Sequence, residues 1–418
     1  MLSYHQNILH LDDVPLPLIA EKFGTPCYIY SQKKLHEQYH LLANALKGVD
    51  ARICFAVKAN SNLAVLKALG QWGAGADIVS AGEMKRALAA GIKAEHMVYS
   101  GVAKTTQEME FALGQGIGQI NVESVPEIAA WSAVASRLNK IAPIAIRVNP
   151  DVDAGTHAKI TTGLKHNKFG IDLAMALEVC RIAQTQPHVK LVGLACHIGS
   201  QLTSLTPFRR AFKRLHKAVL MLAEQGITLE RLDIGGGLGV AYNTETPPPV
   251  EDYAKLIREE LGDLGLKLVL EPGRFLVAEA GILLTQVVVV KTLPERRFLL
   301  VDAGMNDLVR PAMYDAWHNI LPVQQNNNSE TLDFDVAGPV CESSDVFGYD
   351  RLFPANIATG ALLAITHAGA YGSVMSSFYN SRALVPEILV HNQQLAMTRQ
   401  RVSIEEQMNW ETIPAWLT

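Results

Sequence analysis

Residues 53–72 read ICFAVKANSNLAVLKALGQW, and this stretch contains the unit from which the fold is built. A short apolar run, Ile53–Val57, is followed by Lys58 and then by an amphipathic segment, Asn62–Trp72. The first part has the composition of a buried strand, and the second has helical spacing. We therefore predict a strand and a helix, with the lysine at the end of the strand.

The same alternation recurs between about Thr25 and Ala278 until eight strands are reached. We predict strands at Ile53–Val57, Ala76–Val79, Met97–Ser100, Gln119–Val122, Ile144–Val148, Leu191–His197, Leu229–Ile234 and Leu268–Leu270. Helices are predicted at Asn62–Trp72, Ala81–Ala90, Thr106–Gln115, Val125–Leu138, Leu173–Gln184, Leu205–Gln225 and Val250–Leu264. Alternation of this kind predicts a parallel sheet, and eight units favour a closed TIM-type barrel over an open doubly wound sheet.

The pattern changes after Ala280, where apolar runs follow one another without long helices between them. We predict strands at Ile282–Thr292, Phe298–Val301, Leu332–Val336, Leu362–Thr366, Glu387–Val390 and Ala396–Val402. Asp307–Trp317 has helical spacing, and the polar, Asn-rich stretch Gln324–Ser329 is predicted as a loop. The chain would thus hold a barrel domain over residues 25–278 and an all-β domain, a sandwich or Greek-key-like fold, from residues 1–24 and 279–418.

Composition excludes several classes of protein. The 418 residues carry a net charge of −4 without a basic block, so nucleic acid is not an expected partner. The longest apolar run, Ile282–Val290, is far shorter than the ~20 residues of a membrane helix, and no signal peptide is expected. Five scattered cysteines suit a reducing cytoplasm and argue against a structural metal site.

Residues that can carry chemistry follow the predicted strands, where the active sites of α/β barrels lie. Lys58 follows the first strand, and a desolvated lysine there could act as a Schiff-base amine; alone, it could equally reach solvent. His197, after the sixth strand, could stack on an aromatic cofactor, act as a base or be a core histidine.

Two further motifs end the seventh and eighth strands. Asp233-Ile-Gly235-Gly236-Gly237 could bring backbone N–H groups close to a phosphate, or could be a tight turn. Glu271-Pro-Gly273-Arg274 could place a carboxylate on a pyridinium nitrogen, or could form an internal salt bridge. Together the four motifs supply an amine, a stacking group, a phosphate loop and a pyridine partner, which is the set needed to bind pyridoxal 5'-phosphate.

These motifs resemble those of the fold-type III, alanine-racemase-like pyridoxal-phosphate decarboxylases, and within them the diaminopimelate-specific group. The resemblance extends from about Phe23 to Ile404. It implies that Lys58 forms the Schiff base, His197 stacks on the ring and Glu271 pairs with the pyridine nitrogen. It places the remaining predicted cofactor residues around the ring and phosphate, with the Arg274 side chain turned to substrate: Asp77, Ser200, Gly235, Gly236, Gly237, Gly273, Arg274 and Tyr371.

The second domain carries the motifs that discriminate between substrates. The resemblance implies that Arg310 and Tyr314 of DAGMNDLVRPAMY bind substrate, and that Cys341 of GPVCESSD donates a proton. Tyr371 would contact both cofactor and substrate. Glu342 with Arg274 and Arg310 would bind the ammonium and carboxylate at the far end of meso-2,6-diaminopimelate.

The expected reaction is decarboxylation of that diamino diacid to L-lysine and CO2, in a homodimer whose subunits share active sites. Three alternatives remain: a decarboxylase of ornithine, arginine or a siderophore precursor, a racemase of the same fold, and a catalytically inactive relative. Glu342 and Arg310 argue against the first, and Glu271 argues against the second. Phe378, Ala383 and Leu384 depart from the family pattern near the expected subunit contact.

Overall fold

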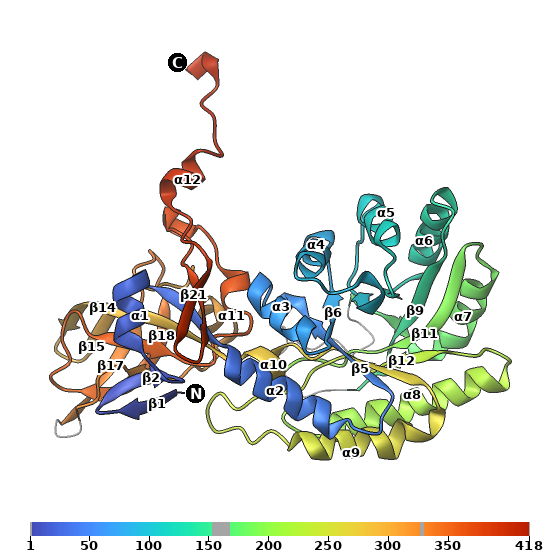
Figure 1. The fold of residues 1–418 in the computed structure, drawn as a ribbon, viewed down its shortest axis with the longest axis horizontal. Helices are drawn as coiled ribbons and strands as arrows, with labels where there is room; N and C mark the ends of the chain where they lie inside the picture. Colours follow the sequence, from blue (N-terminus) through green and yellow to red (C-terminus); the bar gives the residue numbers. More distant parts are fainter. Residues whose placement is uncertain (1, 153–167, 327–329, 418) are drawn as a thin grey trace. The chain divides into compact units, whose positions relative to one another are not determined.

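A computed structural model describes residues 2–152, 168–326 and 330–417 of the chain. These residues form two compact units: residues 36–276, and residues 1–35 together with 277–418. We call them the barrel unit and the β unit, and Figure 1 labels their elements. Of the predicted Asn-rich loop, residues 327–329 lie outside the described part of the chain.

The barrel unit is a closed parallel barrel in which all eight predicted strands are confirmed. Neighbouring strands pair in parallel around the ring, and β8 closes it on β9. In ring order the strands are β9 (Ala142–Asn149), β11 (Val189–Ala195), β12 (Arg231–Asp233), β13 (Lys267–Leu270), β5 (Ala51–Ala56), β6 (Gly75–Ile78), β7 (Met97–Tyr99) and β8 (Gln119–Val122). A two-residue strand, β10 (Ile171–Asp172), pairs with β9. The doubly wound alternative is therefore excluded.

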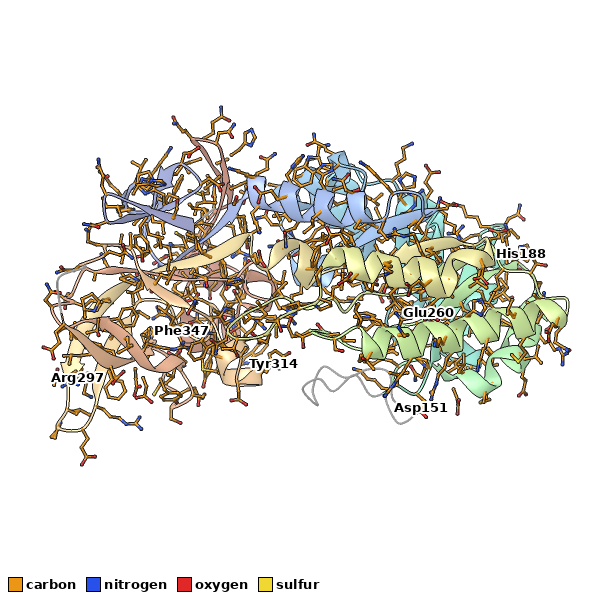
Figure 2. All side chains as sticks on the ribbon, turned by 90° about the horizontal axis from the view of Figure 1, so that it is seen from below. Asp151, His188, Glu260, Arg297, Tyr314 and Phe347 are labelled. Carbon is orange, nitrogen blue, oxygen red and sulfur yellow. The ribbon has the colours of Figure 1, made fainter. Side chains whose placement is uncertain are left out.

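Helices surround these strands within the unit (Figure 1). They are α2 (Gln32–Ala45, which spans both units), α3 (Leu63–Gln71), α4 (Ala81–Ala89), α5 (Thr106–Gln115), α6 (Val125–Arg137), α7 (Ala176–Thr185), α8 (Thr206–Glu224), α9 (Val250–Leu261) and the short α10 (Arg274–Val277). Each amphipathic helix buries its apolar face; on α6, for example, Trp131 is fully buried and meets Tyr99 edge-on. Polar faces pair outside, as where Arg209 of α8 binds Glu260 of α9 at 2.6 Å (Figure 2).

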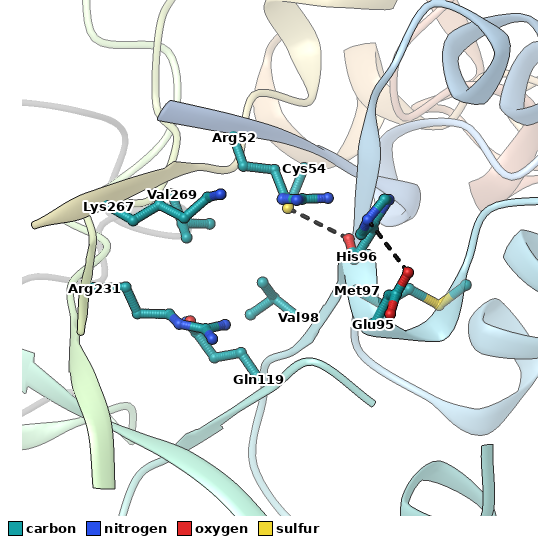
Figure 3. Close-up of a pocket in the computed structure, with 10 residues that line it drawn as sticks. All are labelled: Arg52, Cys54, Glu95, His96, Met97, Val98, Gln119, Arg231, Lys267 and Val269. Carbon is teal, nitrogen blue, oxygen red and sulfur yellow. Dashed lines mark hydrogen bonds and ion pairs between the residues drawn. The ribbon is translucent and has the colours of Figure 1, made fainter. Parts of the chain in front are cut away.

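The barrel has a small polar cavity at the amino ends of its strands, the end opposite to the predicted chemistry (Figure 3). The cavity measures about 90 Å³, and Arg52, Arg231 and Lys267 line it from the first residues of three strands. Cys54 Sγ lies beside it and donates a long hydrogen bond to the His96 carbonyl. In barrels of this kind the amino end contributes to stability, whereas catalytic groups lie at the carboxyl end.

The β unit is built on one long strand, β14 (Gly281–Thr292), which pairs with three other strands. Its remaining strands are β4 (Cys27–Ser31), β15 (Arg297–Val301), β16 (Ile320–Pro322), β17 (Thr331–Ala337), β18 (Val346–Pro354), β19 (Leu362–Ile365), β20 (Glu387–His391) and β21 (Gln394–Arg399). A separate meander holds β1 (Leu2–His5), β2 (Ile8–Leu11) and β3 (Val14–Pro15), followed by α1 (Leu16–Phe23). Two short helices, α11 (Arg310–Tyr314) and α12 (Ile404–Met408), complete it.

Three expectations for this unit need correction. The domain boundary at residue 25 is too early, because Cys27–Ser31 pairs with β14 and β20 of the β unit and therefore belongs to it. β18 was not predicted; polar residues and a glycine interrupt its apolar residues, so its apolar pattern is weak. The expected helix Asp307–Trp317 is only one turn, which begins at Arg310 and ends where Asp315 takes a left-handed backbone conformation.

Candidate active site

Lys58 lies directly after β5, on a single turn of 3₁₀ helix (Val57–Ala59). Its Nζ donates to Asp77 Oδ2 on the neighbouring strand β6 at 2.9 Å. Asp77 is fully buried, and its other oxygen, Oδ1, accepts no hydrogen bond from the described residues. The lysine amine is therefore held at the carboxyl end of the barrel by a carboxylate with spare acceptor capacity.

His197 follows β11 and is partly buried. Desolvation lowers its pKa well below 6.5, and the positive charges of Lys58 and Arg147 lower it further. The Gly236 N–H points at His197 Nδ1 over 3.4 Å, which makes Nδ1 the acceptor and leaves the ring proton on Nε2. The imidazole is thus neutral near pH 7 and suited to lie against an aromatic ring.

The glycines after β12 are required by backbone geometry. Gly235 and Gly237 have φ of 68° and 109°, which side chains rarely adopt. A Cβ at Gly236 would lie 2.1 Å from the Glu271 carbonyl oxygen, and one at Gly235 would lie 2.3 Å from the Cys196 carbonyl oxygen. The turn therefore packs directly on the ends of the two neighbouring strands. Its glycines carry no side chains that would cover the backbone there.

Glu271 ends β13 and is 7% exposed. Its Oε1 accepts from Ser100 Oγ at 3.2 Å and from Asn121 Nδ2 at 3.4 Å. Desolvation raises the pKa of this carboxyl well above its usual value, and the nearby carboxylates of Asp233 and Asp77 raise it further. Glu271 is consequently easier to protonate than an exposed glutamate.

Arg274 is buried next to this carboxyl motif and is oriented by two hydroxyls. Its Nη1 donates to Tyr242 Oη at 2.7 Å, and its Nη2 donates to Ser200 Oγ at 3.2 Å. The direction of the guanidinium is thus set by the Tyr242 and Ser200 hydroxyls.

These groups fit pyridoxal phosphate. An amine at a strand end suits its aldehyde, the neutral imidazole of His197 suits its ring face, and the proton-binding carboxyl of Glu271 suits its ring nitrogen. Gly235–Gly237, Gly273 and the Arg274 guanidinium are the groups that would hold its phosphate or the substrate. The structure brings Lys58, Asp77 and Glu271 close together, because the charges of Lys58 and Asp77 both affect the pKa of the Glu271 carboxyl.

The other predicted substrate residues belong to the β unit. Arg310 begins α11 and is 6% exposed; its Nη1 donates to His318 Nε2 at 2.9 Å. His318 Nδ1 in turn bonds the Thr366 carbonyl at 2.8 Å, which fixes the tautomer with its proton on Nδ1. Tyr314 ends the same helix (Figure 2). Tyr371 has a φ of 55°, a strained conformation typical of functional positions.

Cys341 and Glu342 lie in the turn between β17 and β18, and both are exposed. Asp345 holds this turn by accepting the N–H groups of Val340 and Met305, each at 2.6 Å. The Cys341 N–H donates to Asn380 Oδ1, and Tyr379 Oη donates to the Glu342 carboxylate. The thiol and the carboxylate are thus presented on an ordered turn.

Sequence reasoning missed several residues of this arrangement. Tyr242 and His318 orient two of the predicted arginines, and Glu83 on α4 accepts the Val79 N–H beside Lys58 and Asp77. Desolvation raises the pKa of Glu83 to about 7. None of these residues stands in a motif next to a strand end; only Glu83, three residues after the Ser80 N-cap, carries a local signal, and that signal is one for helix capping.

Comparison with known proteins is consistent with this geometry. Residues 32–278 match the family model described as "Pyridoxal-dependent decarboxylase, pyridoxal binding domain". The chain is 48% identical over 400 residues to the diaminopimelate decarboxylase of Neisseria meningitidis serogroup B, and the matched region covers 96% of each protein.

Two solved structures are similar over both units. The diaminopimelate decarboxylase of Helicobacter pylori complexed with L-lysine has a TM-score of 0.91 and 42% identity, covering 94% of this chain and 98% of its own. That of m. jannaschii in co-complex with L-lysine has a TM-score of 0.95 and 36% identity, covering 100% and 99%. The chain therefore belongs to the pyridoxal-dependent decarboxylases and, within them, to the diaminopimelate decarboxylase family of carboxy-lyases.

Proposed function

We propose that the chain, as a member of this family, releases CO2 from meso-2,6-diaminopimelate and forms L-lysine, with cofactor groups from the barrel unit and substrate groups from the β unit. The observation that carries the assignment of roles is the set of strand-end groups Lys58, Asp77 and Glu271, in which a partly exposed amine lies beside two buried carboxyls. Pyridoxal phosphate, when bound, supplies an aldehyde that links to amines and a ring that accepts the electrons of the leaving carboxylate.

The barrel residues hold and orient that group. Lys58 Nζ is the amine that receives the aldehyde, and Asp77 keeps Nζ at the strand end until it does so. His197 would lie against one face of the ring as a neutral imidazole. Glu271 would pair with the ring nitrogen and favour its protonated, electron-accepting form.

The β unit and Arg274 recognise the substrate. Arg310 is pre-oriented by His318 and offers its remaining N–H groups to a carboxylate, and Glu342 offers an anion to an ammonium. Tyr314 and Tyr371 add hydroxyl groups. Cys341 Sγ delivers the proton to the carbon from which CO2 has left.

We further propose a cytoplasmic homodimer in which Cys341 and Glu342 enter the partner's active site. Their exposure on an ordered turn supports this role, since the chain's other four cysteines are buried. All five cysteines are free, as expected in a reducing compartment. No helix of the described residues is long and apolar enough to cross a membrane.

A decarboxylase of another basic amino acid, such as ornithine or arginine, is the alternative. Arg274 and Arg310 are 7% and 6% exposed. A substrate with a single carboxylate, which is lost in the reaction, would leave these two desolvated cations without a second anionic partner. The L-lysine complexes of the relatives agree with a product that keeps one carboxylate and two amines.

To test this proposal, the purified protein is loaded with pyridoxal phosphate and incubated separately with meso-diaminopimelate, ornithine and arginine. The CO2 and lysine that form are measured. Lysine formed from the first substrate, without CO2 from the others, is expected. For the shared site, Lys58→Ala and Cys341→Ala subunits are mixed at equal amounts after unfolding and refolding together. Random pairing should restore about a quarter of the wild-type activity, because half of the dimers contain one intact site. If mixing restores none while the heterodimer forms, the sites are not shared.

A further inference from the structure

A second carboxyl, Asp233, lies behind Glu271 inside the barrel. Asp233 is the last residue of β12 and is fully buried. Its Oδ1 accepts the Gly235 N–H at 3.0 Å, and its Oδ2 accepts Asn121 Nδ2 at 2.9 Å and Gln119 Nε2 at 3.0 Å. The same Asn121 amide also donates to Glu271 Oε1 at 3.4 Å, so it links the two carboxyls.

The two carboxyls differ in the donors that they accept. Asp233 accepts three N–H donors, and such donors stabilise an ionised carboxylate. Glu271 accepts only the weaker, longer bonds from Ser100 and Asn121. A negative charge is therefore better stabilised on Asp233 than on Glu271.

The donors that hold Asp233 stabilise its charge without cancelling it. Gln119 and Asn121 are neutral amides, two residues apart on β8, so both point into the barrel. The charged and titratable groups that face the pair come from other elements: Asp77 on β6, Lys58 after β5, and the thiols of Cys54 on β5 and Cys196 after β11. Of these, Lys58 already pairs with Asp77 at 2.9 Å. The negative charge of Asp233 therefore acts on whatever lies against Glu271.

We propose that Asp233 is a positioning residue for the cofactor: through Glu271, its buried negative charge keeps the proton on the hydrogen bond between Glu271 and the pyridine nitrogen. This role rests on the proposed function, in which Glu271 meets that nitrogen. No covalent bond is made or broken; the negative charge of Asp233 favours the protonated form of the ring nitrogen that Glu271 would meet. Burial raises the pKa of Asp233 to about 6, so it is ionised at neutral pH.

The test follows the ring nitrogen directly. The holoenzyme is prepared with pyridoxal phosphate labelled with ¹⁵N in the ring, and the ¹⁵N chemical shift, which separates protonated from neutral pyridine, is recorded from pH 6 to 10. Asp233→Asn keeps an oxygen for the Gly235 N–H and removes the charge, together with the oxygen that accepts the Asn121 and Gln119 amides. The midpoint of ring deprotonation should fall by about one pH unit or more, the shift expected on losing a buried charge in contact. Asp263→Asn removes the same charge from an exposed side chain of the barrel unit and should leave the midpoint unchanged.

The possible outcomes are separable. An unchanged midpoint in a folded Asp233→Asn holoenzyme, with a lowered one in Glu271→Gln, refutes the role of Asp233 and leaves the proposed function intact. An unchanged midpoint in both variants means that Glu271 does not meet the ring nitrogen, and the proposed function fails at that point. If Asp233→Asn does not fold, Gln119→Leu, which removes one donor to Asp233, takes its place. It should lower the midpoint by a smaller amount, and no shift there would overturn the inference.

Discussion

His197 should make the cofactor-free barrel unit sensitive to acid. The pKa of its imidazole is well below 6.5 in the folded chain, because the ring is desolvated and faces Lys58 and Arg147. In the unfolded chain it returns to about 6.5. The unfolded state therefore binds more protons below that pH. The contribution of this group to the free energy of unfolding is fully present above pH 6.5. It decreases as the pH falls below 6.5.

The size of the effect follows from the proton count. A ring that stayed neutral down to pH 5.0 would lose about 2 kcal/mol of stability between pH 8 and pH 5, at 1.36 kcal/mol per pH unit. His197 is only partly buried, so it keeps some hydration and some screening from solvent. The expected loss is therefore smaller than this limit of about 2 kcal/mol. The His197→Gln substitution should remove this loss, because glutamine does not titrate.

The assay compares the two proteins without cofactor. Opening free energies at the amides of β11, the strand that precedes His197, are measured by hydrogen exchange in urea at pH 8.0, 6.5 and 5.0. The Asp233–Glu271 pair also titrates in this range, but it is common to both proteins and cancels in the difference. His36→Gln, on the exposed side of α2, is the matched control and should behave like the wild type. Identical pH profiles for His197→Gln and the wild type would refute the reasoning.

Three further substitutions test the site. Lys58→Ala should abolish both CO2 release and the visible absorbance band of the lysine-linked cofactor; a wild-type band in this variant would rule out Lys58 as the anchor. Cys341→Ala should lower kcat by about 10²–10⁴, the usual contribution of a positioned acid, with little change in KM for diaminopimelate, and steady-state kinetics would show the opposite split if Cys341 only bound substrate. His318→Leu removes a charge-assisted hydrogen bond from Arg310, and at about 1.5–3 kcal/mol KM should rise roughly tenfold or more while kcat changes less. An unchanged KM would mean that Arg310 does not bind the substrate.

The barrel was predictable because its signal is local and repeated. Each strand-and-helix unit, such as Ile53–Trp72, carries its own apolar run and its own helical spacing. The strand-end rule then placed Lys58, His197 and Glu271 at one end of the barrel without any knowledge of distances. The same reasoning fails for β4, whose apolar run looks like the others but whose partners, β14 and β20, lie far away in the sequence.

The residues that the sequence did not reveal act through long-range contacts. His318 orients Arg310, and Tyr242 orients Arg274, from positions that no motif marks. Asp233 begins the glycine motif that follows the seventh strand, yet the sequence around it predicts only a glycine turn. Its second partner set, Asn121 and Gln119, comes from more than 110 residues earlier in the chain. Only closure of the barrel brings these groups together.

The charge of this cluster bears on which reaction the fold performs. Asp77 is paired with Lys58, whereas Asp233, which Asn121 links to Glu271, is held by neutral donors and keeps its negative charge at neutral pH. A ring nitrogen that carries a proton neutralises that charge, and a neutral ring nitrogen does not. A racemase of this fold would instead place an arginine on the ring nitrogen, and such a cation beside Asp233 would form an ion pair and leave the ring without its proton. The buried carboxyl pair therefore favours a strongly electron-accepting ring, which decarboxylation needs. In this arrangement the charge of Asp233 adds to the effect of Glu271.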